Sequence, residues 1–113
     1  MIDLKNIKHI FLYPGCTDMR LGLYGLRKLI LETSELEEKS LYIFCGHKLN
    51  QIKIIEVEKY STWLYQNKLN KGKFIWPQEG EKTNITKDQI KMILEGITFV
   101  QRIEKQKAKK DLF

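Results

Sequence analysis

The sequence predicts an α+β fold: one domain on a mostly antiparallel, twisted sheet of about five to six strands, with two helices. Three observations predict it. The 113-residue chain has the length of one domain. Its 42% hydrophobic residues, with five Phe, five Tyr and two Trp, supply one modest core and exclude disorder for most of the chain. Short strand-like runs follow one another at meander spacing, with a helical pattern on either side.

The first strand and the first helix are expected in the first third of the chain. Residues 7–13 are apolar and rich in strand formers, and Pro14-Gly15 ends the run. Residues 22–33 follow helical spacing through the apolar side chains Leu23, Leu26, Leu29 and Ile30. Thr17 or Asp18 is the expected cap of this helix.

Two glycines, Gly22 and Gly25, stand in the first turns of this helix, where glycine costs up to ~1 kcal/mol relative to alanine. One explanation is close packing of the helix start against a strand. The other is access of an anion to the backbone at the helix N-terminus. The sequence leaves both explanations open.

The middle of the chain predicts a β-hairpin followed by two further strands. Residues 41–45 are a buried-strand run, and residues 51–58 alternate as a half-buried strand does. A loop of about five residues joins them. Residues 61–66 and 73–76 are the next expected strands, and Pro77 closes the second of them.

The C-terminal part is expected to hold a short strand at 83–85 and a helix at 86–95. The capping box Thr86-Lys87-Asp88-Gln89 begins the helix, and Gly96 is its expected C-cap. The domain is expected to span residues 1–99. Residues 100–113 then form a basic tail, helical or disordered.

The charge balance raises the question of partners. Twenty Lys and Arg against 14 Asp and Glu give a net charge of +6. Residues 100–113, with five basic and two acidic side chains, hold half of that excess. Such a tail is typical of a solvated terminus that aids solubility, or of a segment that contacts nucleic acid.

Enzyme signatures are absent from the sequence. It contains no HExxH, GxSxG, P-loop or GxGxxG pattern, and two Cys with two His fall short of a usual zinc site. Cys45 and His47 fit a buried thiol beside a turn better than a catalytic pair. We therefore expect no enzyme activity, no metal and no cofactor.

The sequence also bears on location. No run approaches the ~18 apolar residues of a membrane span, so we expect a cytoplasmic protein with no membrane partner. Reduced thiols are expected there, although a bridge between Cys16 and Cys45 stays open.

Two features point to binding. Arg20, beside the predicted helix start, could clamp a phosphate or a carboxylate, or form a salt bridge with Asp18. The stretch 59–73 contains four lysines, no acid and several aromatic residues close by. Amines that neutralise phosphate and rings that stack on bases suit a nucleic-acid surface. Ordinary sheet patterning, with lysines that guard an edge strand, is the alternative.

Four blocks in order and spacing resemble a known family: residues 14–26, the hairpin strands, residues 68–77 and residues 85–97. The chain resembles, over about residues 10–98, the small accessory protein of insertion-sequence family 66. This is the TnpB-type product of the second reading frame, unrelated to the RNA-guided nuclease of the same label. The matching motif positions are Thr17, Asp18, Met19, Arg20, Gly22, Gly25, Lys53, Lys68, Gly72, Trp76 and Pro77.

The resemblance implies an accessory role in DNA transposition, with catalysis left to a separate transposase. The expected partners are that transposase and DNA, with the element ends as the expected DNA site. The candidate nucleic-acid-binding residues are Arg20, Lys48, Lys53, Lys68, Lys71 and Lys73. The hairpin turn departs from the family's arginine-rich pattern, because Lys48 is its one full charge. The alternative is an adaptor that binds the transposase and never touches DNA.

Overall fold

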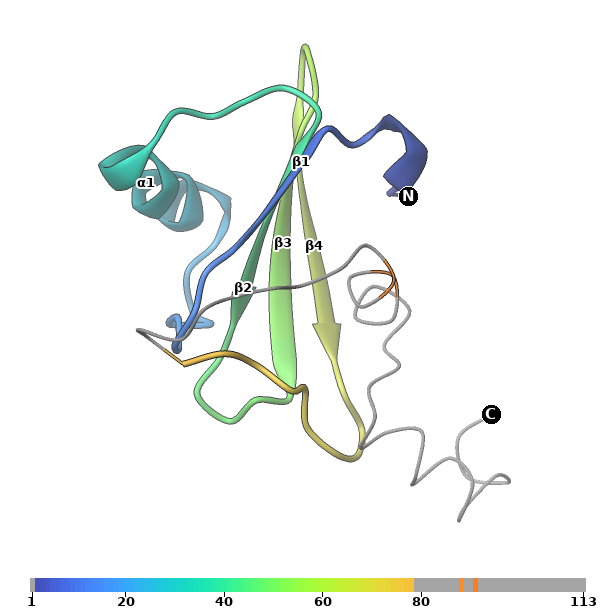
Figure 1. The fold of residues 1–113 in the computed structure, drawn as a ribbon. Helices are drawn as coiled ribbons and strands as arrows, with labels where there is room; N and C mark the ends of the chain where they lie inside the picture. The colour runs from blue at the N-terminus through green and yellow to red at the C-terminus, as the bar shows by residue number, and fades with distance from the viewer. Residues whose placement is uncertain (1, 79–87, 89–90, 92–113) are drawn as a thin grey trace.

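A four-stranded sheet in the order β1-β2-β3-β4 forms the centre of the protein (Figure 1). The computed structural model describes residues 2–78 together with Asp88 and Lys91. Its elements are η1 (Leu4–Asn6), β1 (His9–Leu12), α1 (Leu23–Thr33), β2 (Ser40–Cys45), β3 (Gln51–Val57) and β4 (Thr62–Lys68).

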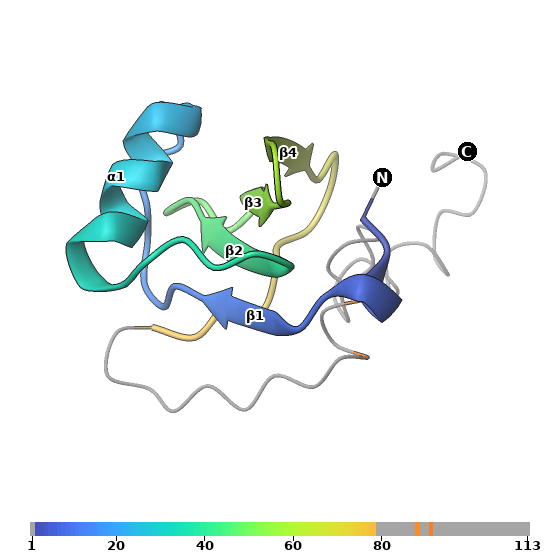
Figure 2. The same ribbon diagram turned by 90° about the horizontal axis from the view of Figure 1, so that it is seen from above.

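The sheet is mixed, whereas the sequence predicted a mostly antiparallel one. β1 and β2 are parallel neighbours, in register from His9↔Ser40 to Leu12↔Ile43. The chain must cross over between parallel strands, and α1 provides that crossover on one face of the sheet (Figure 2). β2, β3 and β4 then form the antiparallel meander that the sequence predicted. The α+β class is thus confirmed in outline, with one helix beside the sheet in the described part.

The strand expected at 73–76 is wrong. Residues 69–77, here called the strap, follow β4 and form no strand. They contact the neighbouring loops through single main-chain hydrogen bonds. Phe74 N donates to Leu49 O at 2.6 Å, and Gly15 N donates to Pro77 O at 2.9 Å. Two of the aromatic side chains of this stretch, Phe74 and Trp76, are instead buried in the core. The described sheet therefore has four strands, fewer than the five to six expected.

The other C-terminal expectations lie outside the described residues. These are the strand at 83–85, the tail at 100–113 and most of the helix at 86–95, of which Asp88 and Lys91 are described and helical. No helix in the described part of the chain is long and apolar enough to cross a membrane.

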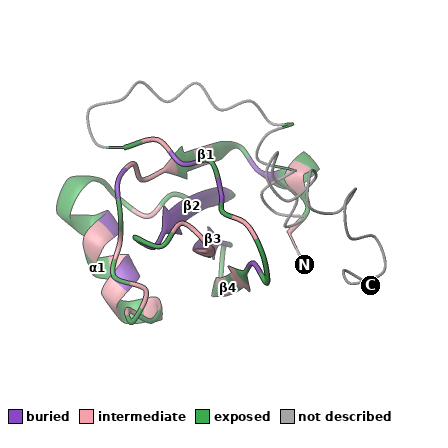
Figure 3. Ribbon diagram, turned by 90° about the horizontal axis from the view of Figure 1, so that it is seen from below, coloured by how far each residue is buried: buried purple, intermediate pink, exposed green. Residues whose placement is uncertain are grey.

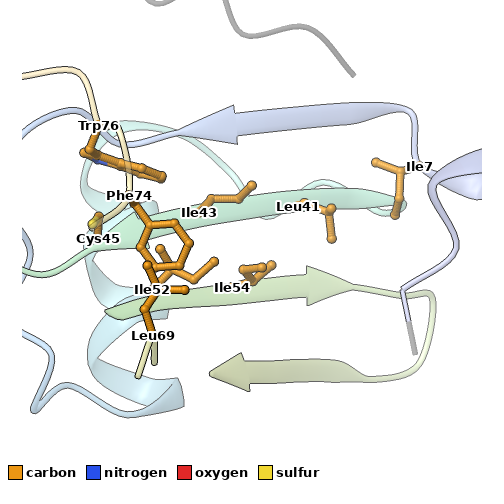
Figure 4. Packing of buried hydrophobic residues seen from close by; sticks show 9 residues of the cluster. All are labelled: Ile7, Leu41, Ile43, Cys45, Ile52, Ile54, Leu69, Phe74 and Trp76. Atoms are coloured by element: carbon orange, nitrogen blue, oxygen red, sulfur yellow. The ribbon is translucent and has the colours of Figure 1, made fainter. Parts of the chain in front are cut away.

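Both faces of the sheet are covered, which explains why β2 is buried along its whole length (Figure 3). On one face, α1 packs its inner side chains on alternate residues of the central strands: Leu26, Ile30, Tyr42, Phe44, Ile55 and Val57. On the other face, the strap and the N-terminal segment close a second cluster (Figure 4): Ile7, Leu41, Ile43, Cys45, Ile52, Ile54, Leu69, Phe74 and Trp76.

The helix starts without the predicted side-chain cap. Its N-cap is Gly22, which makes no side-chain hydrogen bond, so the expectation of Thr17 or Asp18 is wrong. The reason is local, because the Asp18 carboxylate is held by Arg20 within the preceding loop. Nothing lies within 4 Å of a Cβ added at Gly22, whereas one at Gly25 would meet Leu21 Cδ2 at 2.8 Å. Gly25 is therefore crowded by the side chain of Leu21 in the preceding loop and not by a strand, and no neighbour crowds Gly22.

Candidate nucleic-acid interface

Three loops far apart in sequence meet at one end of the sheet (lower end in Figure 1). They are residues 13–22 after β1, residues 46–50 between β2 and β3, and the strap. Main-chain hydrogen bonds join them to the sheet and to one another: Thr17 N donates to Cys45 O at 2.8 Å, and Leu69 N donates to Asn50 O at 2.7 Å. We call this the basic end, because of the cations described next.

Exposed lysines gather at the basic end. Lys48 lies in the hairpin turn, Lys68 ends β4, and Lys71 and Lys73 lie in the strap; all four are exposed. Gln51 pairs with Lys68 across β3 and β4, which brings the hairpin turn beside the start of the strap. Within these three loops, Asp18 is the one acidic residue.

Lys59 does not belong to this cluster. It lies in the turn between β3 and β4, at the opposite end of the sheet, with its ammonium 5.2 Å from the ring centroid of Tyr60. The acid-free stretch 59–73 therefore runs along the whole length of β4, and Lys59 is separated from the other three lysines of the stretch. The loops at that opposite end are mixed in charge, with Glu35, Glu37, Glu38 and Glu58 alongside Lys39 and Lys59.

Asp18 and Arg20 form a bidentate ion pair on the surface of the first loop. Arg20 Nη2 donates to Asp18 Oδ2 at 2.8 Å, and Nε donates to Oδ1 at 3.0 Å. The main-chain nitrogen of Arg20 also donates to Oδ1, at 2.9 Å. These hydrogen bonds lower the pKa of the Asp18 carboxyl to about 2. The salt bridge that the sequence offered as an alternative is thus present, and the Arg20 side chain remains 91% exposed.

Lys53 is buried, unlike the other candidate cations. Its residue is 6% exposed, and its Nζ donates a hydrogen bond of 2.7 Å to Leu21 O. A buried ammonium needs such a partner, because desolvation penalises an unpaired charge. The structure therefore gives a structural reason for a lysine at this motif position. Sequence patterns could not show this contact, because the partner is a main-chain oxygen 32 residues away.

Several other motif positions shape the basic end. Met19 packs on Gly46, where an added Cβ would lie 2.6 Å from Met19 Cγ. Gly72 has a φ of 80°, a left-handed conformation that favours glycine. Trp76 is buried and donates from Nε1 to Tyr13 O at 2.9 Å. Pro77 accepts from Gly15 through its carbonyl. Trp76 and Pro77 thus hold the strap against the loop that carries Arg20.

Cys45 and His47, the two residues considered as a catalytic pair, differ in burial. Cys45 lies in the core, where burial raises the pKa of its thiol to about 12, while His47 is exposed. Both cysteines are free, and Cys16 is exposed. Among the described residues, no three His, Cys, Asp or Glu side chains gather as metal ligands would. A hollow on the face opposite α1, lined by residues that include Ile2, Ile54 and Tyr65, contains neither Arg20 nor His47.

Comparison with known proteins places the chain in a family. The family model described as IS66 Orf2-like protein matches residues 8–104. The chain belongs to the IS66 Orf2-like family. The resemblance expected from the motifs is therefore confirmed, and with it an association with transposition as an accessory protein.

One relative of this IS66 Orf2-like chain is the uncharacterized protein y4hO of Sinorhizobium fredii. The two are 30% identical over 96 residues, which cover 82% of this chain and 83% of the relative. No solved structure matches the chain.

Proposed function

We propose that the protein is a non-enzymatic accessory of DNA transposition that binds duplex DNA through the basic end of its sheet. The observation that supports this is the assembly of Lys48, Lys68 and Lys71 at one end of the sheet, on two adjoining loops and the last residue of β4, although about twenty residues of sequence separate the first two. Lysines on a fixed surface neutralise phosphates and release counterions, and this supplies most non-specific affinity for DNA.

The arrangement of charge indicates which end of the sheet would face the DNA. The basic end carries one carboxylate, Asp18, and that carboxylate is already paired with Arg20. The opposite loops carry more carboxylates than lysines. Within the described residues, a duplex that approaches the basic end therefore meets lysines and no unpaired carboxylate in the three loops that form it. The element ends remain the expected DNA site, and the transposase the expected protein partner.

A salt series tests the proposal. Binding of the full chain to a fluorescent duplex of element-end sequence is measured between about 50 and 200 mM salt. We expect affinity to fall steeply with salt. The double variant K68Q/K71Q is expected to reduce the slope of log affinity against log salt by about 2, because each phosphate contact contributes ~0.9. The matched control is K39Q/K59Q, which removes the same charge from the opposite end.

Two results would contradict the proposal. One is no binding of the wild-type chain at about 50 mM salt. The other is an equal change of slope in K68Q/K71Q and K39Q/K59Q, which would assign the effect to net charge alone. Thermal unfolding of both double variants checks that each is folded.

A second role, as an adaptor that binds the transposase without DNA, is supported by the aromatic surface of β4. Trp63 is 51% exposed and stacks beside Tyr65 with ring centroids 6.3 Å apart. Exposed Trp and Tyr are enriched at protein interfaces. Co-purification with the transposase after nuclease treatment, lost in Trp63→Ala, would support this role. Loss of co-purification on nuclease treatment would contradict it.

A further inference from the structure

The loop that carries Arg20 is fixed to the sheet at both of its ends. At its start, Thr17 N donates to Cys45 O at 2.8 Å; at its end, Leu21 O accepts from Lys53 Nζ at 2.7 Å. Between them, Leu21 N donates to Asp18 O at 3.2 Å, and Met19 packs on Gly46. The loop that carries residue 20 is thus anchored to β2 and β3, which are among the most buried of the described elements.

The guanidinium itself is fixed as well. Asp18 occupies its Nε–Nη2 edge through hydrogen bonds of 3.0 Å and 2.8 Å. A guanidinium has five N–H donors in a planar fork, so the end-on edge still offers two parallel donors, one from Nη1 and one from Nη2. The side chain is 91% exposed, so this edge is open to a ligand. The ion pair favours one arrangement of the arginine, which lowers the rotamer entropy that binding costs.

The pairing also selects the kind of ligand. Asp18 and Arg20 together carry no net charge, and the carboxylate beside the guanidinium repels a phosphate. A neutral group with two acceptors side by side suits the open edge better. In the major groove, guanine presents O6 and N7 in this arrangement, and bidentate contact from arginine is the commonest specific base contact.

We propose that Arg20 reads a guanine in the major groove, with its end-on edge donating to O6 and N7, and that Asp18 is its positioning residue. The inference rests on the proposed DNA binding, in which the lysines of the basic end supply the phosphate contacts. Phosphate contacts fix the position of a protein on the duplex, and base contacts specify the sequence. Arg20 would therefore contribute sequence preference to a surface whose affinity comes from lysines.

Selection from a randomised duplex library, with the full chain as bait, tests this directly. Wild type is expected to enrich a motif with one invariant guanine. Replacing that guanine by 7-deazaguanine, which lacks the N7 acceptor, should lower wild-type affinity by roughly 5- to 150-fold, the range that corresponds to 1–3 kcal/mol per bidentate base contact. Arg20→Ala removes both donors to the base, so its affinity should be the same for both duplexes.

Asp18→Asn tests the positioning role. The variant leaves Arg20 in place, so the salt slope should stay within about 1 of the wild-type value. The discrimination between guanine and 7-deazaguanine should fall. A discrimination equal to that of wild type would overturn the positioning role. Arg20 and Asp18 are on the surface, and thermal unfolding of both variants verifies that they fold.

The outcomes separate this inference from the proposed function. Salt-dependent binding without any guanine preference would overturn the inference alone. So would an equal loss of affinity for every duplex in Arg20→Ala, which would make Arg20 a phosphate contact. No binding of wild type to any duplex at about 50 mM salt would overturn the proposed function, and the inference with it.

Discussion

Lys53 Nζ donates a hydrogen bond of 2.7 Å to the main-chain oxygen of Leu21, and so ties β3 to the loop that begins α1. The lysine stands in a strand whose residues from 52 to 57 are all buried. Its positive charge also helps to lower the pKa of Asp18. One buried side chain therefore joins the helical layer, the sheet and the exposed ion pair.

Removing this ammonium should destabilise the fold. In Lys53→Met the aliphatic stem is retained, but Leu21 O loses its donor. We expect the free energy of unfolding to fall by about 1–3 kcal/mol, the usual cost of leaving a buried hydrogen-bonding group without its partner. Urea denaturation measures it. Lys71→Met, at an exposed position, is the matched control and should stay within about 0.5 kcal/mol of wild type.

Gly46 and Met19 should be energetically coupled. A Cβ at position 46 would lie 2.6 Å from Met19 Cγ, so in Gly46→Ala the methionine must move. Overpacking of this kind costs about 1–3 kcal/mol. The double variant Gly46→Ala/Met19→Ala makes room for the new methyl group. A double-mutant cycle should give a coupling of about 0.5–3 kcal/mol, and strictly additive losses would show that the two residues do not compete for space.

The same substitution at two glycines should have opposite signs. Gly22 is an uncapped N-cap with φ −92° and open space around its Cβ position. Serine there can cap the helix and restrict the unfolded chain, for a gain of about 0.5–1 kcal/mol. Gly72 has φ 80°, so Gly72→Ser should cost about 1–2 kcal/mol. Chemical denaturation compares them, and a loss of stability in Gly22→Ser would contradict the capping argument.

The Asp18–Arg20 pair should respond to acid in a defined window. The carboxyl pKa is lowered from 3.8 to about 2, so the pair favours the folded state above pH 4. That contribution is lost as the pH falls from about 4 to about 2. Carboxyl-carbon NMR titration should place the Asp18 midpoint near 2 in wild type. In Arg20→Gln the midpoint should rise toward the usual range, and an unchanged midpoint would assign the shift to another group.

The two cysteines should react at very different rates. Cys16 is exposed, whereas Cys45 is fully buried and its pKa is raised to about 12. At pH 8 an alkylating reagent should modify Cys16 in the folded protein, and Cys45 only after unfolding in urea. Mass spectrometry of protease digests identifies the modified residue. Equal labelling of both in the native state would contradict the burial of Cys45.

Periodicity predicted most elements of the described part because each has one clear hydrophobic pattern. The helix expected at 22–33 is observed at Leu23–Thr33, and the hairpin at 41–45 and 51–58 is observed at Ser40–Cys45 and Gln51–Val57. Sequence patterns do not show which strands become neighbours. The parallel pairing of β1 with β2 depends on how α1 packs, and that packing is a long-range property.

Only part of the candidate site could be predicted from the sequence, for a similar reason. The motif positions converge on one end of the sheet, and the Asp18–Arg20 pair was among the alternatives considered. Composition could not separate Lys53 from the surface lysines, because its partner is a main-chain oxygen. Composition also could not show that Lys59 and Lys68 lie far apart, since both belong to one acid-free stretch. β4 lies between them and places them at opposite ends of the sheet. Residue type predicts charge, but topology decides which charges meet.

The separation of charge along the strands gives the described part of the protein an electric dipole moment. Its positive pole lies at the end of the sheet with Lys48, Lys68 and Lys71, and its negative pole at the opposite loops with Glu35, Glu37 and Glu58. Near a polyanion such a dipole experiences a torque before any contact forms, which turns the positive pole foremost. Rotational alignment at a distance shortens the search for a productive encounter. Because ions screen the field beyond about 10 Å at 0.1 M salt, this pre-alignment weakens as salt rises.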